Sequence, residues 1–239
     1  MQDFYFIVTF AIPPGQEPVF RQQLDAIAAR LRNAPGGAGG SGTLYEVAPA
    51  VEEQLLQVPG IAAALQQRPD ARASFRFVLL AHWASLGQYE AVVRATPDDT
   101  PISFPAYPAY YRLAAEYTGT ASAAAPAEFT FINPFEVAIE QEHEFEPLWR
   151  STIEQLHTAP GFISARLFAV DDAIEAALGQ VPRIAGALQS RANGRARFRF
   201  IWVSQWATLA QYEIAVRAFG RGNPLPFASH PAFYQAATN

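Results

Sequence analysis

Hydrophobic side chains recur along this chain with two different periods, and each period predicts a type of element. Residues 4–12 and 129–137 are rich in aromatic and β-branched side chains, which is typical of strands. After each of these strands, apolar residues recur at steps of three and four, which predicts an amphipathic helix. The positions are Phe20, Leu24, Ala28 and Leu31 after the first strand, and Phe145, Trp149, Ile153 and Leu156 after the second.

Proline and glycine mark the ends of these helices, because proline cannot continue a helix and glycine supplies the positive φ of a C-cap. The two stops are Pro35-Gly36 and Pro160-Gly161. A short strand is predicted after each stop, over residues 43–47 and 163–170.

An Ala/Leu-rich insert comes next in each case, over residues 50–67 and 173–190. Each insert contains a proline, Pro59 or Pro182, so we expect two short helices with the proline at the start of the second. A long strand and a helix capped by Ser85 or Thr208 follow. The last segment could be a helix or a strand, and we assign it to a strand. The long strands are predicted over 73–83 and 196–206, and the last segments over 104–117 and 227–237.

The same order of elements is predicted twice because the sequence itself repeats. Trp83 recurs as Trp206, 123 residues later, within a stretch where Phe75-Arg76-Phe77 matches Phe198-Arg199-Phe200. Near the start the shift is 125 residues, from Phe10 to Phe135, so the first copy carries two extra residues. A repeat of this length is a whole domain rather than a solenoid unit.

Strand, helix, strand, strand, helix, strand is the order of the ferredoxin-like unit. Such a unit leaves one face of its sheet open, and two units can cover each other. The predicted fold class is therefore α+β, with two tandem ferredoxin-like domains that form an intramolecular pseudo-dimer. We place the domains at residues 1–117 and 128–239, and the small and polar residues 118–127 form the predicted linker.

Composition narrows the classes of function. The chain has 239 residues, of which 50% are hydrophobic, enough for two globular domains. A net charge of −5 argues against nucleic-acid and anionic-membrane partners, since both need a basic face. There is no cysteine, hence no disulfide and no thiolate nucleophile. Without a basic leader or an apolar stretch long enough to cross a bilayer, a cytoplasmic protein is expected.

Several stretches of the second copy carry a family resemblance. They are Phe131-Ile132-Asn133-Pro134-Phe135, Phe145 with Trp149, and residues 159–164, 196–206 and 229–234. With these motifs, most of residues 128–239 resembles the antibiotic biosynthesis monooxygenase superfamily, the dimeric α/β-barrel proteins. The first copy matches more weakly. The superfamily includes cofactor-independent oxygenases of anthrones and quinols as well as haem-degrading enzymes, so the resemblance implies a fold more firmly than a reaction.

Two features depart from the family pattern. In haem-degrading relatives a histidine ligand lies about three helical turns beyond the strand-end tryptophan. Here that region is Val216-Arg217, so we expect no haem, and no other cofactor either. The inserts at 50–67 and 173–190 are absent from short family members and could cover or wall a pocket.

Metal, nucleotide and serine-hydrolase chemistry are not expected. The histidines show no metal-ligand spacing, and the chain has no His-Glu-x-x-His, Gly-rich phosphate loop or Gly-x-Ser-x-Gly elbow. The acidic run from Glu140 to Glu144 begins a predicted helix, where carboxylates favour the helix dipole and solvent.

Asn133 and His230 are the candidate catalytic residues. Asn133 interrupts an apolar strand where the first copy has Val8, and a buried amide is unfavourable unless it is hydrogen-bonded. It could orient a phenol or ketone oxygen, or be satisfied by neighbouring backbone. His230, replaced by Tyr107 in the first copy, is the best general base available because histidine titrates near neutrality. Beside Pro231 it could equally be a surface histidine in a turn.

Trp206, Trp202 and Tyr212 are candidate substrate-binding residues. The resemblance implies that Trp206 lines the substrate pocket, whereas its survival as Trp83 in the first copy favours a packing role. Trp202 replaces Leu79 and is either core or cavity wall. Tyr212 could donate a hydrogen bond to substrate or simply pack in the core.

Arg199 is the fourth candidate substrate-binding residue. It lies within a predicted strand and could hold an anionic substrate oxygen. The alternative that we favour is an ion pair with Glu136 or Glu213.

The resemblance implies a cofactor-independent monooxygenase that oxidises an electron-rich aromatic, quinol or polyketide-type substrate with O2. The alternative is a non-catalytic, or differently catalytic, binder of a small apolar aromatic ligand. In both cases the site is expected in the second domain, and the first domain is expected to be degenerate and structural. The expected partners are a small aromatic and O2, with neither nucleic acid nor membrane, and a homodimer of the fused chain remains open.

Overall fold

The computed structural model describes residues 3–33, 40–58, 61–62, 65, 68, 73–96, 102–119, 126–191, 194–219 and 225–237. The first copy forms the strands β1 (Phe4–Phe10), β2 (Gly40–Val47), β3 (Phe77–Trp83) and β4 (Ala106–Thr118), and the helices α1 (Glu17–Asn33), α2 (Pro49–Leu55) and α4 (Leu86–Ala95). The second copy forms the strands β5 (Phe129–Glu136), β6 (Phe162–Val170), β7 (Phe200–Trp206), β8 (Ala228–Ser229) and β9 (Ala232–Ala236). Its helices are η2 (Ile139–Gln141), α5 (Glu142–Leu156), α6 (Asp172–Leu178), α7 (Pro182–Gln189) and α8 (Leu209–Phe219).

Local signals in the sequence explain where several helices begin and end. The hydroxyl oxygens of Ser85 and Thr208 accept hydrogen bonds from the backbone N–H groups of Gln88 and Gln211, which confirms both predicted caps. Pro182 begins α7, as predicted for the second insert. Gly161 has a φ of 79° after α5, which confirms its predicted positive φ. Gly36 and Pro59 lie outside the described residues.

Other bounds differ from the prediction. β3 and β7 begin at Phe77 and Phe200, later than the predicted residues 73 and 196. The last segment of each copy is a strand, as assigned, but in the first copy it runs for 13 residues and includes Thr118, the first residue of the predicted linker. In the second copy the segment breaks into β8 and β9 around Pro231, which lacks the amide that a sheet ladder needs. Residues 120–125 of the linker lie outside the described residues.

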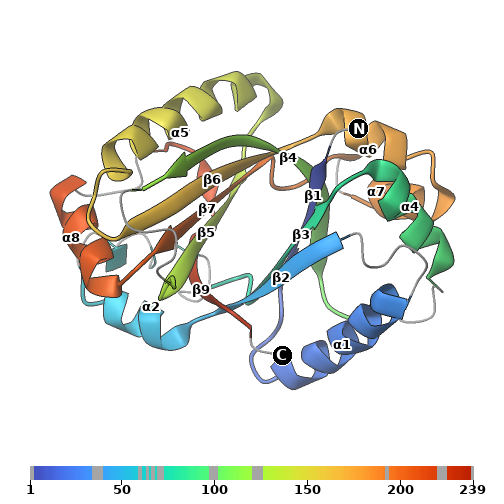
Figure 1. The fold of residues 1–239 in the computed structure, drawn as a ribbon, viewed down its shortest axis with the longest axis horizontal. Helices are drawn as coiled ribbons and strands as arrows, with labels where there is room; N and C mark the ends of the chain where they lie inside the picture. Colours follow the sequence, from blue (N-terminus) through green and yellow to red (C-terminus); the bar gives the residue numbers. More distant parts are fainter. Residues whose placement is uncertain are drawn as a thin grey trace. The chain divides into compact units, whose positions relative to one another are not determined.

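Each copy has the strand order of a ferredoxin-like sheet (Figure 1). The orders are β4-β1-β3-β2 in the first copy and β9-β5-β7-β6 in the second, and the central pairs β1–β3 and β5–β7 are antiparallel. Pairings β2–β9 and β4–β6 join the copies, so the hydrogen-bonded ladder returns to its start after eight strands. Together with the helices, these antiparallel strands confirm the α+β class.

The chain divides into two compact units that do not coincide with the two copies. Unit 1 consists of Met1–Leu44, Phe75–Arg112 and Val170–Arg197, and unit 2 consists of Tyr45–Ser74, Leu113–Ala169 and Phe198–Asn239. Helices α6 and α7 of the second copy therefore belong to unit 1, and α2 of the first copy belongs to unit 2. The inserted helices of each copy are exchanged into the core built on the other copy.

Two apolar clusters lie among the described residues of unit 1. In one, Ile174, Leu178, Val181 and Ile184 from α6 and α7 pack with Phe4, Trp83, Tyr89 and Tyr110 of the first copy. In the other, Val8, Phe10, Phe20 and Phe77 pack together, with Leu24 and Leu79 against them. Full burial of such a side chain contributes about 1.5–3 kcal/mol, so the exchanged helices stabilise unit 1 substantially.

The described residues of unit 2 include a large apolar core. Val51 and Leu55 of α2 join a cluster that contains the side chains of β5, β7, α5 and α8, among them Phe131, Trp149 and Trp202. Phe145 of α5 packs between Phe135 and Phe200, with ring centroids 4.8 and 4.2 Å away. Helix α5 therefore covers the face of β5 and β7 that carries these aromatic side chains.

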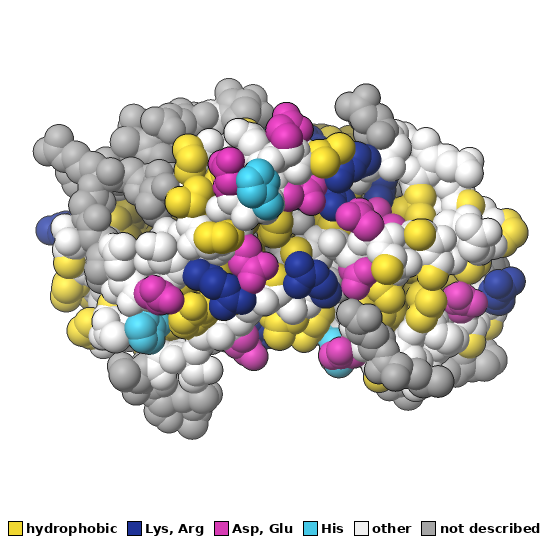
Figure 2. All heavy atoms as spheres, turned by 90° about the horizontal axis from the view of Figure 1, so that it is seen from above, with side chains coloured by type: hydrophobic (Ala, Val, Ile, Leu, Met, Phe, Trp, Pro, Cys, Tyr) yellow, Lys and Arg dark blue, Asp and Glu magenta, His cyan; other side chains and the backbone are white. Residues whose placement is uncertain are grey.

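Charged side chains of both signs lie interspersed on the face shown in Figure 2. The described residues include ion pairs, such as Arg150 with Glu146 on α5, where Nη2 and Oε1 are 2.6 Å apart. None of the described helices has the length and apolar character needed to cross a membrane.

Candidate functional site

Several core positions that are aliphatic in the first copy are polar or aromatic in the second, and three of them lie close together. The residues of the second copy are Asn133, Trp149 and Trp202, and their counterparts in the first copy are Val8, Leu24 and Leu79. In unit 1 the three aliphatic counterparts belong to one apolar cluster, and Val8 lies opposite Leu79 across β1 and β3. The first copy therefore fills these positions with side chains that have no polar atoms.

In unit 2 the same positions are polar and aromatic. Asn133 lies opposite Trp202 across β5 and β7, and the rings of Trp202 and Trp149 meet edge to face with centroids 6.3 Å apart. Phe131 also meets Trp202 edge to face, at 5.2 Å. Because side chains alternate along a strand, Asn133 shares its face of β5 with Phe131 and Phe135, which both lie in the core cluster.

Buried polar atoms in this cluster have no hydrogen-bond partner among the described residues. They are Oδ1 of Asn133, which is only 2% exposed, and the indole Nε1 atoms of Trp149, Trp202 and Trp206. Leaving one such group unpaired costs about 1–3 kcal/mol. In unit 1, Nε1 of Trp83 has no partner among the described residues either, so an unpaired indole at this position is common to both copies. The unpaired atoms of Asn133, Trp149 and Trp202 have no equivalent in unit 1.

Tyr212 differs from its counterpart in the first copy, Tyr89, in the residue that faces its hydroxyl group. In unit 1 the hydroxyl groups of Tyr89 and Tyr110 are 2.9 Å apart and hydrogen-bonded. The second copy has Phe233 in place of Tyr110, and the ring of Tyr212 packs edge to face against Phe233 and Trp206. Burial raises the pKa of the Tyr212 hydroxyl, so this group is held as a neutral phenol.

His230 does not lie with Asn133. Its Nε2 is 2.9 Å from Oε1 of Glu136, its backbone N–H donates to the carbonyl of Pro134, and its side chain is 12% exposed. Glu136 and Pro134 alternate with Asn133 along β5, so they belong to the opposite face of the strand. The structure thus brings Asn133 together with Trp202 and places the imidazole of His230 beside the other face.

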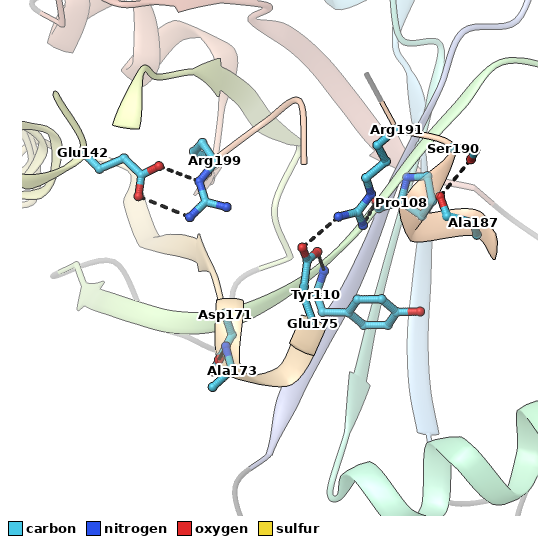
Figure 3. A network of polar contacts seen from close by, with 10 residues as sticks. All are labelled: Pro108, Tyr110, Glu142, Asp171, Ala173, Glu175, Ala187, Ser190, Arg191 and Arg199. Carbon is cyan, nitrogen blue, oxygen red and sulfur yellow. Dashed lines mark hydrogen bonds and ion pairs between the residues drawn. The ribbon is translucent and has the colours of Figure 1, made fainter. Parts of the chain in front are cut away.

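Arg199 is 4% exposed and forms a two-point ion pair with Glu142 at the start of α5 (Figure 3). The distances are 2.7 Å from Nε to Oε1 and 3.2 Å from Nη2 to Oε2. The expected ion pair of Arg199 is present with Glu142 as the carboxylate at these atoms, and Glu213, one of the two expected partners, pairs with Arg217 of the next turn.

The first copy has an equivalent ion pair, Arg76 with Glu17, whose Nε and Oε1 are 2.9 Å apart. Its presence in both copies favours a structural role for Arg199. Sequence reasoning missed Glu142 because it treated the acidic run as solvent-exposed. The repeat could have indicated the pair, since Glu142 follows Glu17 by the same 125 residues that separate Phe10 from Phe135.

Metal and haem sites find no support in the described residues. No group of three His, Asp or Glu side chains among them could hold a metal ion. At the position where the resemblance would require a haem ligand, α8 carries Val216 and Arg217, and Arg217 is 64% exposed and paired with Glu213. The residues at this position do not fit a haem.

Comparisons with known proteins identify the fold. No protein-family model matches the chain, and no curated protein matches it by sequence. Among solved structures, an anthrone oxidase-like protein matches with a TM-score of 0.55 and 13% identity, over 99% of this chain and 91% of that chain.

Two further solved structures are less similar. A chlorite dismutase variant from Candidatus Nitrospira defluvii has a TM-score of 0.46 and 9% identity over 98% of this chain and 91% of its own. A haem-degrading enzyme from Listeria monocytogenes has a TM-score of 0.40 and 11% identity over 99% of this chain and 100% of its own. The first match shows that the chain shares the fold of an anthrone oxidase-like protein.

Proposed function

We propose that unit 2 binds an electron-rich aromatic molecule beside Asn133 and Trp202 and that the bound molecule is oxidised by O2 without a cofactor. One observation carries the proposal: the positions that hold Val8, Leu24 and Leu79 in the first copy hold an amide and two indoles in the second, with buried polar atoms that none of the described residues pairs. A stable core keeps such atoms unpaired only at a cost in stability, and ligand sites are where that cost is repeatedly observed.

The chemistry of these atoms selects the ligand class. Oδ1 of Asn133 accepts a hydrogen bond, so it suits the hydroxyl of a phenol. The indole N–H groups of Trp149 and Trp202 only donate, so they suit a ketone or phenolate oxygen. The edges and faces of the surrounding rings suit an aromatic body. A hydroxylated aromatic ring system meets all of these requirements.

Such a ligand supplies the reactivity itself. The deprotonated phenol gives one electron to O2, and recombination of the two radicals forms a carbon–oxygen bond as a ring peroxide. Collapse of the peroxide breaks the O–O bond and gives a quinone and water, so one O2 is consumed for each phenol. The residues of unit 2 would exclude water, orient the ring and stabilise the anion through the indole donors.

Trp206, Tyr212, His230 and Arg199 have different parts in this proposal. Trp206 and Tyr212 wall the aromatic body through the ring contacts described above. Arg199 is engaged by Glu142, so it contributes to the position of α5. His230 was the predicted general base, but it lies beside the face of β5 opposite to Asn133, so we expect His230→Gln to keep 1-naphthol binding, and unchanged turnover in this variant would exclude a catalytic role.

The second candidate function is an aromatic binder that does not consume O2. It is favoured by the position of His230 beside the face of β5 opposite to Asn133, because the binding residues are then present without a base among them. Both candidates predict a saturable change in tryptophan fluorescence on addition of 1-naphthol. Only the oxygenase also predicts O2 uptake and formation of 1,4-naphthoquinone.

Asn133→Val is the variant that decides between site and core, because it restores the residue of the first copy. Loss of 1-naphthol binding in this variant, with binding retained in the control Val8→Ala, supports the site. If the unaltered chain shows no response to 1-naphthol, 1,8-dihydroxynaphthalene or related phenols, the proposal is wrong.

We also propose that the two copies form an intramolecular pseudo-dimer that descends from a homodimer. The equivalent contacts in units 1 and 2 support this. A chain of residues 128–239 alone should then be insoluble or should associate with a second copy of itself in analytical ultracentrifugation. A stable, soluble monomer would contradict the pseudo-dimer.

A further inference from the structure

A buried ion pair fastens the inserted segment of the first copy to the last strand of unit 2. Nη1 and Nη2 of Arg68 lie 2.9 and 3.2 Å from the two carboxylate oxygens of Glu52, and the side chains are 3% and 12% exposed. Arg68 also donates to the carbonyl of Pro231 at 3.3 Å, and the N–H of Phe233 donates to Glu52 at 3.4 Å. We call Glu52 and Arg68 the clasp of unit 2.

Unit 1 contains the same clasp, made by Glu175 and Arg191 of the second copy (Figure 3). Arg191 pairs with Glu175 at 2.8 Å and donates to the carbonyl of Pro108 at 2.6 Å, and the N–H of Tyr110 donates to Glu175 at 3.3 Å. Every residue of this clasp lies 123 positions from its counterpart. The contacts recur at four equivalent positions, so the ion pair is a repeated structural feature of the fold rather than a chance surface pair.

The clasp of unit 2 acts on Phe233. Both backbone groups of Phe233 are held by the first copy, the N–H by Glu52 and the carbonyl by the N–H of Ala48 at 2.8 Å. The ring of Phe233 contacts Phe131 and Tyr212, with centroids 5.4 and 5.5 Å away. Phe131 in turn packs against Trp202, which lies opposite Asn133.

The first copy therefore reaches the candidate site in two ways. Val51 and Leu55 of α2 belong to the same core cluster as Trp202, and the clasp fixes the backbone that carries Phe233. The second copy does not supply these contacts itself, because its own inserted helices, α6 and α7, pack in unit 1.

We propose that the first copy completes the ligand site of the second, and that Glu52 and Arg68 are positioning residues that set the aromatic wall at Phe233. The proposal rests on the proposed aromatic site. It assigns the first copy a part in ligand binding, beyond the structural part expected from its sequence.

The duplicated clasp supplies a matched control for the test. Glu52→Gln and Glu175→Gln are made in the full chain, so each removes one charge from an equivalent buried pair. Affinity for 1-naphthol is measured by tryptophan fluorescence, and stability by thermal unfolding. We expect both variants to lose stability, and Glu52→Gln alone to weaken 1-naphthol binding, roughly tenfold, because a displaced wall misplaces the ligand. Equal affinities in the two variants would overturn the proposal.

A second measurement needs no ligand and separates this inference from the proposed function. Amide hydrogen exchange should accelerate at Phe233 in Glu52→Gln and at Tyr110 in Glu175→Gln, because each amide loses its charged acceptor. If exchange at Phe233 is unchanged, the clasp does not position it and the inference fails. If exchange behaves as expected but the unaltered chain binds no aromatic, the failure belongs to the proposed function.

Discussion

Replacement of Asn133 by valine should make the protein more stable and less able to bind its ligand. Oδ1 of Asn133 is buried and has no hydrogen-bond partner within the described part of the chain, and Val8, at the equivalent position of the first copy, has no polar side-chain atom. Removal of an unpaired buried polar group recovers about 1–3 kcal/mol. Asparagine and valine have similar volumes, so no large cavity opens. The free energy of unfolding should therefore rise by about 1–3 kcal/mol.

Thermal unfolding followed by circular dichroism measures this change. For chains of this size, roughly 2–4 °C of melting temperature corresponds to 1 kcal/mol, so the transition should rise by several degrees. The lost hydrogen bond to the ligand is worth about 0.5–1.5 kcal/mol, which weakens 1-naphthol binding by roughly two- to twelvefold. Val8→Asn is the reverse change in unit 1, and it should lower stability by a similar amount.

The result that would refute this reasoning is a loss of stability in Asn133→Val by more than about 1 kcal/mol. Such a loss would mean that the amide has a structural partner in the folded protein. A gain in stability with unchanged 1-naphthol binding would mean that the buried amide is destabilising but does not contact the ligand. The core would then tolerate an unpaired amide for a reason other than the proposed ligand.

Three further predictions concern stability. Glu142→Gln should lower the free energy of unfolding by about 1.5–3 kcal/mol in urea titrations, and Glu17→Gln by less, because Arg199 is 5% exposed and Arg76 is 21% exposed. Burial raises the pKa of Tyr89 to about 12, so its contribution to stability is complete below about pH 10 and is lost as the pH rises towards 12. Alkaline unfolding should accordingly be less steep in Tyr89→Phe, and an equal slope would contradict the assignment. Gly161→Ala should lower the melting temperature, because φ is 79° and a methyl group would meet Gln211, whereas Gly186→Ala in α7 should not.

The order of elements could be predicted from the sequence because it depends on local patterns. Periodicity located the strands and helices, and Ser85, Thr208 and Gly161 act on the backbone within a few residues of themselves. Duplication then supplied the ferredoxin-like order twice. The remaining differences are at strand ends, where β3 and β7 begin only at the residues that find a partner strand.

The candidate site was harder to predict because it depends on contacts between distant segments. Asn133 could be singled out as a polar residue in an apolar strand, but nothing local indicates which face of β5 receives His230. No local pattern indicates that Glu142 pairs with a buried arginine, because its partner Arg199 is 57 positions away. The exchange of α2 with α6 and α7 leaves each copy's pattern intact, so periodicity cannot reveal it.

The exchange of inserted helices has a consequence for how this chain reaches its native state. Glu52 accepts a hydrogen bond from the amide of Phe233, 181 positions further along the chain, so α2 cannot dock until β9 has left the ribosome. Until then Val51 and Leu55 remain without their native neighbours, and closing so long a loop is slow. Biogenesis of this protein should therefore be sensitive to chaperone supply during the interval between the synthesis of α2 and the emergence of β9.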